Sequence, residues 1–228
     1  MTILSGKRGL IVGVANERSA AWGIAKKASD LGAELAFTYQ IPAFEKRIAP
    51  LAESVKSDIM IPCDLSEEAA AKKAMERLST HWSEVDFVVH AVGFSDKQEL
   101  SGAYYNTSRQ NFRQTMLMSA FSFTELAQAS APMMPNGGSL LTLSYLGSVR
   151  TTPNYNVMGV AKAALEASVR YLAVDLGGRN IRVNGLSAGP MKTLAGAAIS
   201  GSRGIFRCLL YTSPSPRDVE ESRMPSSA

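Results

Sequence analysis

Residues 9–25 read GLIVGVANERSAAWGIA, a short apolar run followed by a glycine, a polar turn and the start of an amphipathic stretch. This pattern predicts a buried strand at Gly9–Val14 that leads through a turn into a helix. In such a unit, glycines and a small residue such as Ser19 let backbone amides approach a phosphate at the helix N-terminus. The spacing is not G-x-G-x-x-G, so Gly13 and Gly23 could also serve only a tight turn and helix packing.

Short apolar runs and longer amphipathic stretches continue to alternate along the chain. Further strands are predicted at Glu34–Tyr39, Asp58–Cys63, Asp86–Val92, Ser139–Ser144 and Ile181–Leu186. Helices are predicted at Ala20–Leu31, Phe44–Val55, Ser66–Trp82, Asn111–Ala131 and Tyr155–Leu176, with Ser66 as an N-cap and Gly177-Gly178 as a stop. Apolar runs without alternation are typical of parallel strands covered on both faces. We therefore expect an α/β fold, a single-domain doubly wound parallel sheet of the Rossmann type.

Composition excludes several classes of protein. The 228 residues are 46% hydrophobic and 19% charged, which is typical of one globular domain rather than disorder, collagen or a coiled coil. No apolar run approaches the ~20 residues that cross a bilayer, and we expect a cytoplasmic protein. Cys63 and Cys208 are expected to be reduced thiols, and no metal site is expected. The net charge of +4 is spread over short basic runs, which argues against nucleic-acid binding.

Polar or small residues end successive predicted strands, where a doubly wound sheet binds its ligand. Gln40 follows the second strand, where a dinucleotide site usually has an acid for the ribose or an Arg for a 2′-phosphate. A neutral amide favours NADH over NADPH, because it offers no charge to a phosphate. Asp64 could accept from an adenine amino group, and Val92 could lie against the adenosine ribose. Together these strand ends predict a dinucleotide site.

Tyr155 and Lys162 are seven residues apart in a predicted helix, so both side chains project from one face. A nearby ammonium is expected to lower the pKa of the phenol and make it a better proton donor to a developing oxyanion. The same spacing is also common on solvated helix faces. His90, within an apolar strand, is expected to be a hydrogen-bonded core residue, and Met158 could line an acyl pocket.

The last residues, 208–228, differ abruptly in composition from the rest of the chain. Back-translation of residues 208–218 and 222–228 fits codons that resemble a transposase mosaic end followed by a sequencing adapter. We therefore interpret residues 1–207 as an incomplete Rossmann-type reductase domain and residues 208–228 as translated adapter rather than native protein.

Longer stretches of the chain carry a family resemblance. GKRGLIVGVANERSAAWGIA, GAELAFTYQ, HAVGF, LLTLSYLGSVRTTPNYNVMGVAKAALEASVRYLA and IRVNGLSAGPMKTLA resemble the enoyl-acyl-carrier-protein reductases of bacterial type II fatty-acid synthesis. That family is a divergent branch of the short-chain dehydrogenase/reductases. Its Tyr-x6-Lys pair matches Tyr155 and Lys162, whereas 3-oxoacyl reductases use Tyr-x3-Lys and a Ser at the position of Tyr145.

The resemblance implies NADH-dependent reduction of the trans-2 double bond of an enoyl thioester carried by acyl-carrier protein. It implies catalytic roles for Tyr145, Tyr155 and Lys162. It implies cofactor contacts from Gly13, Ser19, Ala20, Gln40, Asp64, Val92, Lys162 and Thr193. A homotetramer is expected for the full-length enzyme.

Because the family continues beyond Arg207, we expect this chain to lack the last helix and strand and to be inactive as written. Two alternatives remain open: a 3-oxoacyl or other carbonyl reductase, and a dinucleotide-binding protein without catalysis.

Overall fold

The computed structural model describes residues 2–189, 191 and 193. Within them, the strands form one parallel sheet in the order β3-β2-β1-β4-β5-β6. The strands are β1 (Arg8–Val12), β2 (Glu34–Tyr39), β3 (Ile59–Pro62), β4 (Phe87–His90), β5 (Gly138–Ser144) and β6 (Ile181–Ser187). Strand order reverses between β1 and β4, and a ligand crevice forms outside the carboxyl ends of the strands at such a point.

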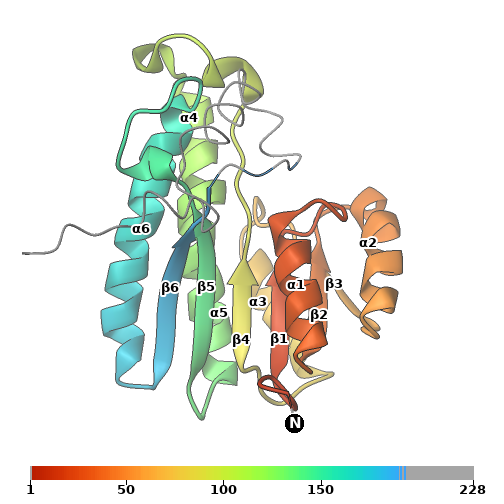
Figure 1. Ribbon diagram of the computed structural model, residues 1–228. Coiled ribbons are helices and arrows are strands. Elements are labelled where there is room, and N and C mark those ends of the chain that lie inside the picture. The colour runs from red at the N-terminus through yellow and green to blue at the C-terminus, as the bar shows by residue number, and fades with distance from the viewer. Residues whose placement is uncertain (1, 190, 192, 194–228) are drawn as a thin grey trace, which may run out of the picture.

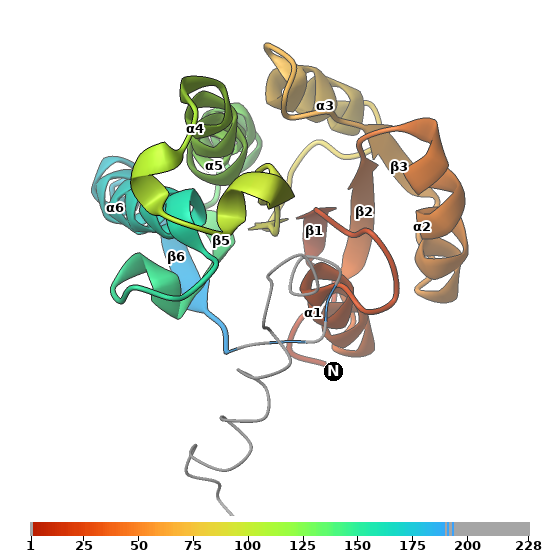
Figure 2. The ribbon, with the colours of Figure 1, turned by 90° about the horizontal axis from the view of Figure 1, so that it is seen from above.

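Helices cover both faces of this sheet (Figures 1 and 2). They are α1 (Ala20–Asp30), α2 (Pro42–Ser54), α3 (Ala70–Ser79), α4 (Arg109–Met116), α5 (Ser122–Ser130) and α6 (Asn156–Gly177). The helices α1 and α2 pack on one face, and α3, α5 and α6 pack on the other. The expected α/β fold, a doubly wound parallel sheet of the Rossmann type, is confirmed.

Two hydrophobic cores lie on opposite sides of the sheet. Leu10 and Ile11 are neighbours in β1, and both are fully buried, one in each core. Phe37 and Trp22 contact each other in the core under α1 and α2, with ring centroids 6.2 Å apart. Because every side chain of such a strand is covered, its sequence shows an unbroken apolar run instead of alternation.

Two local predictions were wrong. Helix α3 begins at Ala70 instead of Ser66, because Ala69 has a left-handed backbone with φ 58°; before it, the amide and hydroxyl of Ser66 both donate to Asp64 in a turn. The single helix expected at Asn111–Ala131 is divided into α4 and α5 by a π-helical turn at Leu117–Phe121. Such turns are rare in proteins, and those that occur often lie at functional sites.

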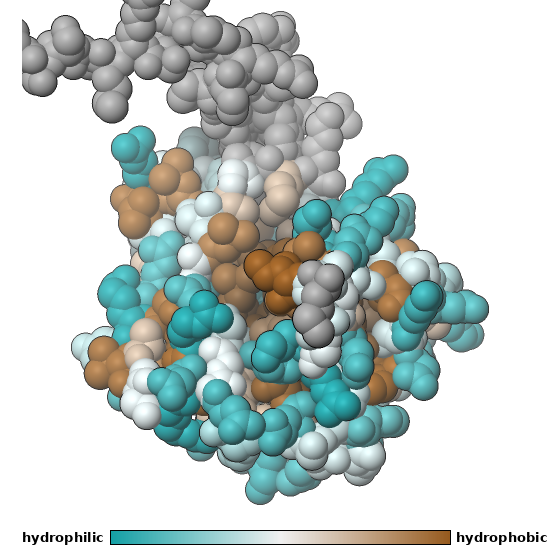
Figure 3. Space-filling model, turned by 60° about the horizontal axis from the view of Figure 1, so that its bottom comes forward, coloured by the Kyte–Doolittle hydropathy of each residue, from teal (hydrophilic) through white to brown (hydrophobic). Residues whose placement is uncertain are grey.

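The described surface is mostly hydrophilic on the face seen in Figure 3, with hydrophobic residues in small groups between polar ones. In the described part of the chain, no helix is both long and apolar enough to cross a membrane. The segment 208–228, interpreted above as adapter, lies outside the described residues, as does any further strand or helix after β6.

Candidate functional site

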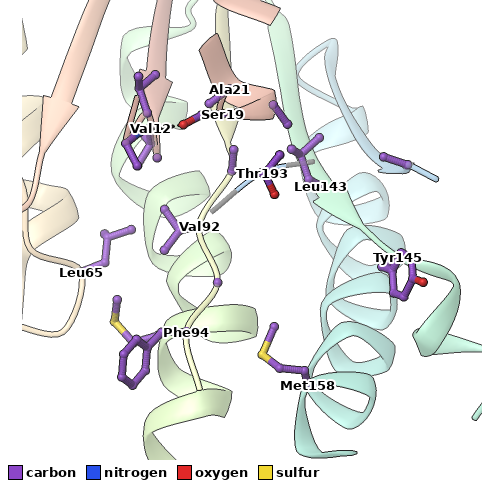
Figure 4. Close-up of a pocket in the computed structure, with 18 of the residues that line it drawn as sticks. Val12, Ser19, Ala21, Leu65, Val92, Phe94, Leu143, Tyr145, Met158 and Thr193 are labelled. Atoms are coloured by element: carbon purple, nitrogen blue, oxygen red, sulfur yellow. Dashed lines mark hydrogen bonds between the residues drawn. The ribbon is translucent and has the colours of Figure 1, made fainter. Parts of the chain in front are cut away.

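A cavity of about 580 Å³ opens at the carboxyl ends of the strands. Its lining includes most of the residues that the sequence singled out, namely Gly13, Ser19, Ala20, Gln40, Val92, Tyr145, Tyr155, Lys162 and Thr193. Asp64 does not line it, although its neighbours Cys63 and Leu65 do. Figure 4 shows Ser19 toward one end of the cavity and Phe94 and Met158 toward the other.

We call the part of the cavity formed by β1, β2 and α1 the α1 end. Gly13 has φ +105°, and a Cβ there would stand 2.3 Å from the carbonyl oxygen of Ala91. Only glycine fits this turn without strain, because L-residues rarely adopt that conformation and no space is left for a side chain. The turn thereby lets β1 lead directly into the loop before α1.

Ser19 is the N-cap residue of α1, but its side chain makes no hydrogen bond to the helix. Its hydroxyl oxygen instead accepts from the amides of Ala15 and Asn16, each at 3.0 Å, and so shapes the preceding loop. The first turn of α1 also contains no acidic residue. An N-terminus without a side-chain cap suits an anionic group, because the helix dipole and the first amides point at it.

Gln40 and Asp64 form a polar pair at the ends of β2 and β3. The Gln40 Nε2 atom donates to Oδ1 of Asp64 at 3.0 Å. Partial burial alone would raise the pKa of Asp64, but hydrogen bonds from Ser66 and Gln40 lower the pKa below its usual value. The cavity is therefore lined here by the neutral amide of Gln40, with the carboxylate of Asp64 hydrogen-bonded behind it.

The middle of the cavity is formed by the segment after β4 and by the π-helical turn. Ser119, in that turn, is fully buried. Its hydroxyl donates to the carbonyl of Phe94 at 2.9 Å and accepts from the amide of the same residue at 2.8 Å. Met118 from the turn also lines the cavity. The irregular turn thus holds the backbone that follows Val92 in place.

The other part, which we call the α6 end, contains the buried pair Tyr155 and Lys162, only 6% and 7% exposed. Lys162 Nζ donates to the carbonyl oxygen of Leu143 in β5 at 2.8 Å. The rings of Tyr145 and Tyr155 meet edge to face, with centroids 5.1 Å apart and planes at 66°. Tyr155 and Lys162 therefore line one enclosed site instead of a solvated helix face.

The electrostatics of this end differ from the expectation. Burial raises the pKa of Tyr155, and the neighbouring Tyr145 raises it further, so the expected lowering by an ammonium is wrong for the chain without ligand. Burial lowers the pKa of Lys162 to about 8, against an opposing effect of Glu166. Near neutral pH the site therefore holds a neutral phenol and a mostly protonated amine.

Other titratable residues take structural roles. His90 is fully buried between Thr142 and Ser122, with a ring nitrogen 2.9 Å from each hydroxyl, and burial lowers its pKa to about 3. It is a hydrogen-bonded core residue, as expected. Cys63 is a free buried thiol, and burial raises its pKa to about 11. Among the described residues, no group of three or more His, Cys, Asp or Glu side chains is placed to hold a metal ion.

Sequence reasoning missed several residues of the site. Phe94, Leu100 and Met118 line the cavity. Ser119 and Glu166 form hydrogen bonds to residues that line it, Phe94 and Ser144. Phe94 lies two residues after the predicted strand end at Val92, which could have identified it. The role of Ser119 depends on a π-helical turn, for which the sequence carries no signal that we recognise.

The model of the enoyl-(acyl carrier protein) reductase family matches residues 13–226. The chain is 55% identical to enoyl-[acyl-carrier-protein] reductase [NADH] 2 of Rhizobium meliloti over 226 residues, 99% of this chain and 84% of the relative. Among solved structures, it is similar to FabI from Candidatus Liberibacter asiaticus, with a TM-score of 0.90, 54% identity, and coverage of 95% of this chain and 83% of the other.

A second solved structure is the enoyl-(acyl-carrier-protein) reductase of Anaplasma phagocytophilum in complex with NAD. Its TM-score is 0.90 at 52% identity, with 93% of this chain and 81% of the other covered. On the family match and these identities, the chain belongs to the enoyl-(acyl carrier protein) reductase family.

Proposed function

We propose that the protein reduces the trans-2 double bond of enoyl thioesters on acyl-carrier protein with NADH, the last step of a fatty-acid elongation cycle. The observation that carries this proposal is the joint placement of Tyr155 and Lys162, both buried, in the cavity that also contains Gly13 and Ser19. Relatives at 55% and 45% identity are named NADH-dependent enoyl-[acyl-carrier-protein] reductases, which supports the same activity.

The α1 end fits a dinucleotide. The glycine turn at Gly13 and the N-terminus of α1, without a side-chain cap, suit a pyrophosphate. Gln40 and Asp64 suit the adenosine, and Lys162 and Thr193 are assigned to the nicotinamide half. The carboxylate behind Gln40 disfavours a 2′-phosphate, since like charges repel, so we assign NADH as the preferred cofactor.

When bound, NADH supplies a hydride to the β-carbon of the enoyl thioester. Negative charge then develops on the thioester carbonyl oxygen, and the neutral Tyr155 hydroxyl donates a hydrogen bond to that oxygen. A proton from solvent at the α-carbon completes the saturated thioester. The raised pKa keeps the proton on Tyr155 until charge develops. The Lys162 ammonium, held by the carbonyl of Leu143, would hold the ribose of the cofactor and add positive potential. Tyr145 packs against the Tyr155 ring and limits its orientation.

The acyl chain is assigned to the apolar part of the cavity. Phe94, Leu100, Met118 and Met158 line it, and Figure 4 shows Phe94 and Met158 away from Ser19. Flexible methionine side chains adapt to chains of different shape. This placement puts the reacting thioester beside Tyr155 and the hydrocarbon against apolar side chains.

A homotetramer remains part of the proposal. Tyr171 and Val174, one turn apart on α6, are 76% and 80% exposed and form a small apolar surface. Association of α6 with a second copy would cover them. Light scattering of the purified protein measures the assembly.

The deciding experiment is turnover of crotonyl thioester with NADH, followed by loss of NADH absorbance. For the enzyme completed beyond Arg207 we expect activity with the enoyl thioester, less with NADPH, and none with a 3-oxoacyl thioester, whereas the chain as written is expected to be inactive. Reduction of the 3-oxoacyl substrate alone would favour the carbonyl reductase. Binding of NADH without turnover of either substrate would favour a non-catalytic dinucleotide-binding protein.

A further inference from the structure

Glu166 connects the two elements that carry the tyrosines. It lies on α6, one turn after Lys162. Its Oε1 atom accepts a hydrogen bond from the hydroxyl of Ser144, at the end of β5, and another from Ser148, each at 2.5 Å. Ser148 ends a short 3₁₀ helix, Leu146–Ser148, so one carboxylate oxygen holds both ends of the segment 144–148.

The same segment is packed tightly against α6. A Cβ at Gly147 would stand 2.4 Å from the ring of Tyr155, and a Cβ at Gly159 would stand 2.8 Å from the carbonyl oxygen of Gly147. The segment therefore has no room to move closer to the helix. The two hydrogen bonds to Glu166 oppose its movement away, and Tyr145, inside the segment, keeps its edge-to-face contact with Tyr155.

The charge of Glu166 acts on the neighbouring ammonium. Burial is the largest influence on Lys162 and lowers its pKa to about 8, whereas Glu166 raises it. Burial, and to a smaller extent the charge of Lys162, disfavours protonation of His90 in β4 and lowers its pKa to about 3. His90 is thus neutral at working pH, and Glu166 is the charged group that favours the ammonium.

We propose that Glu166 is a positioning residue for the reduction: through Ser144 and Ser148 it holds Tyr145 against Tyr155, and its carboxylate, one turn from Lys162 on the same helix, attracts the Lys162 ammonium. The inference rests on the proposed function and goes beyond it, because Glu166 itself does not line the cavity. The two roles can be separated, since one needs an oxygen acceptor and the other needs a negative charge.

Glu166→Gln keeps an amide oxygen that can accept both hydroxyls but removes the charge. We expect kcat near neutral pH to stay within about threefold of the unaltered protein, while the alkaline limb of the pH profile moves to lower pH. The double variant Ser144→Ala/Ser148→Ala keeps the charge and removes both donors. It should lower kcat about tenfold or more without moving that limb, because misplaced groups in a site commonly cost up to ~100-fold.

Glu166→Ala should combine both effects. Asp175→Asn is the matched control, since it removes an exposed carboxylate from the same helix, and it should change neither kcat nor the pH profile. Thermal melting of each variant shows whether it is folded. An alkaline limb that stays in place in Glu166→Gln overturns the electrostatic role, and an unchanged kcat in the folded double serine variant overturns the positioning role.

The affinity for NADH, measured by fluorescence titration against pH, separates this inference from the proposed function. If the enzyme completed beyond Arg207, without further substitution, binds NADH but does not reduce crotonyl thioester, the proposed function has failed. The inference then survives only if the pH at which NADH affinity falls is lower in Glu166→Gln than in the unaltered protein and in Asp175→Asn. Equal pH dependence in all three proteins overturns it.

Discussion

At the α1 end of the cavity the chain offers backbone amides and polar side chains near the surface, whereas at the α6 end it buries two titratable groups. Gln40 is exposed and Asp64 half-buried, and the two satisfy each other. Tyr155 and Lys162 are less than a tenth exposed, and burial moves the pKa of each away from its ordinary value. The α1 end thus relies on backbone shape and polar groups near the surface, and the α6 end on buried titratable groups with shifted pKa values.

The comparison indicates where each kind of substitution should act. Shape and backbone conformation decide binding at the α1 end, so a steric change there should affect stability and affinity. Electrostatics in a low-dielectric site decide the chemistry at the α6 end, so removal of a single atom there should affect turnover.

Tyr155→Phe should lower kcat by about 10²–10³-fold, because only the hydroxyl that meets the developing charge is lost. NADH affinity should change by less than about threefold, since the ring and its contact with Tyr145 remain. Steady-state kinetics and fluorescence titration measure the two quantities. A loss of NADH affinity as large as the loss of turnover would contradict the assignment of binding to the α1 end and chemistry to the α6 end.

Gly13→Ala should destabilise the fold by about 2–4 kcal/mol, because the new Cβ meets the carbonyl of Ala91 in a left-handed conformation. Gly23 is the matched control. It lies within α1, and a Cβ there meets nothing within 4 Å, so Gly23→Ala should stabilise the protein by about 0.5–1 kcal/mol. Denaturant unfolding compares the two, and equal effects would mean that the turn at Gly13 is not sterically specified.

Lys162→Met should stabilise the protein without ligand by about 1–3 kcal/mol near neutral pH, because the buried ammonium is costly to the folded state. The pKa of Lys162 is about 8 when folded and near its ordinary value of 10.5 when unfolded. The penalty is therefore full below pH 8 and disappears as the pH rises toward 10.5. Unfolding free energies of both proteins across this range should converge, and a constant difference would contradict the assigned burial cost.

Gln40→Arg should shift the cofactor preference toward NADPH by about 5–20-fold, the smallest of these effects, because the guanidinium is exposed and Asp64 competes for it. Gln98→Arg makes the same charge change at an exposed position that does not line the cavity. The ratio of kcat/KM for the two cofactors is the measurement. An equal shift in both variants would trace the preference to net charge rather than to the end of β2.

Much of the fold followed from local pattern. The unbroken apolar runs predicted all six described strands, and β2 agrees at both ends. The start of α3 was predicted wrongly: Ser66 looked like an N-cap, but it lies in a turn in which it donates to Asp64, and the left-handed backbone of Ala69 delays the helix to Ala70. The division of the helix at Leu117–Phe121 was also not predicted, because Ser119 forms hydrogen bonds to Phe94, 25 residues earlier in the chain.

For the site, the sequence by itself determined which residue types meet at the strand ends, because parallel strands bring their carboxyl ends to one edge. It therefore predicted Gly13, Gln40 and Val92 as neighbours of one cavity, and the family resemblance added Tyr155. Only the tertiary structure decided their electrostatics. The packing of α6 against β5 decides whether a phenol or an ammonium is buried and which carboxylate faces it. This packing therefore determines the pKa values of Tyr155 and Lys162 and the contacts of Glu166.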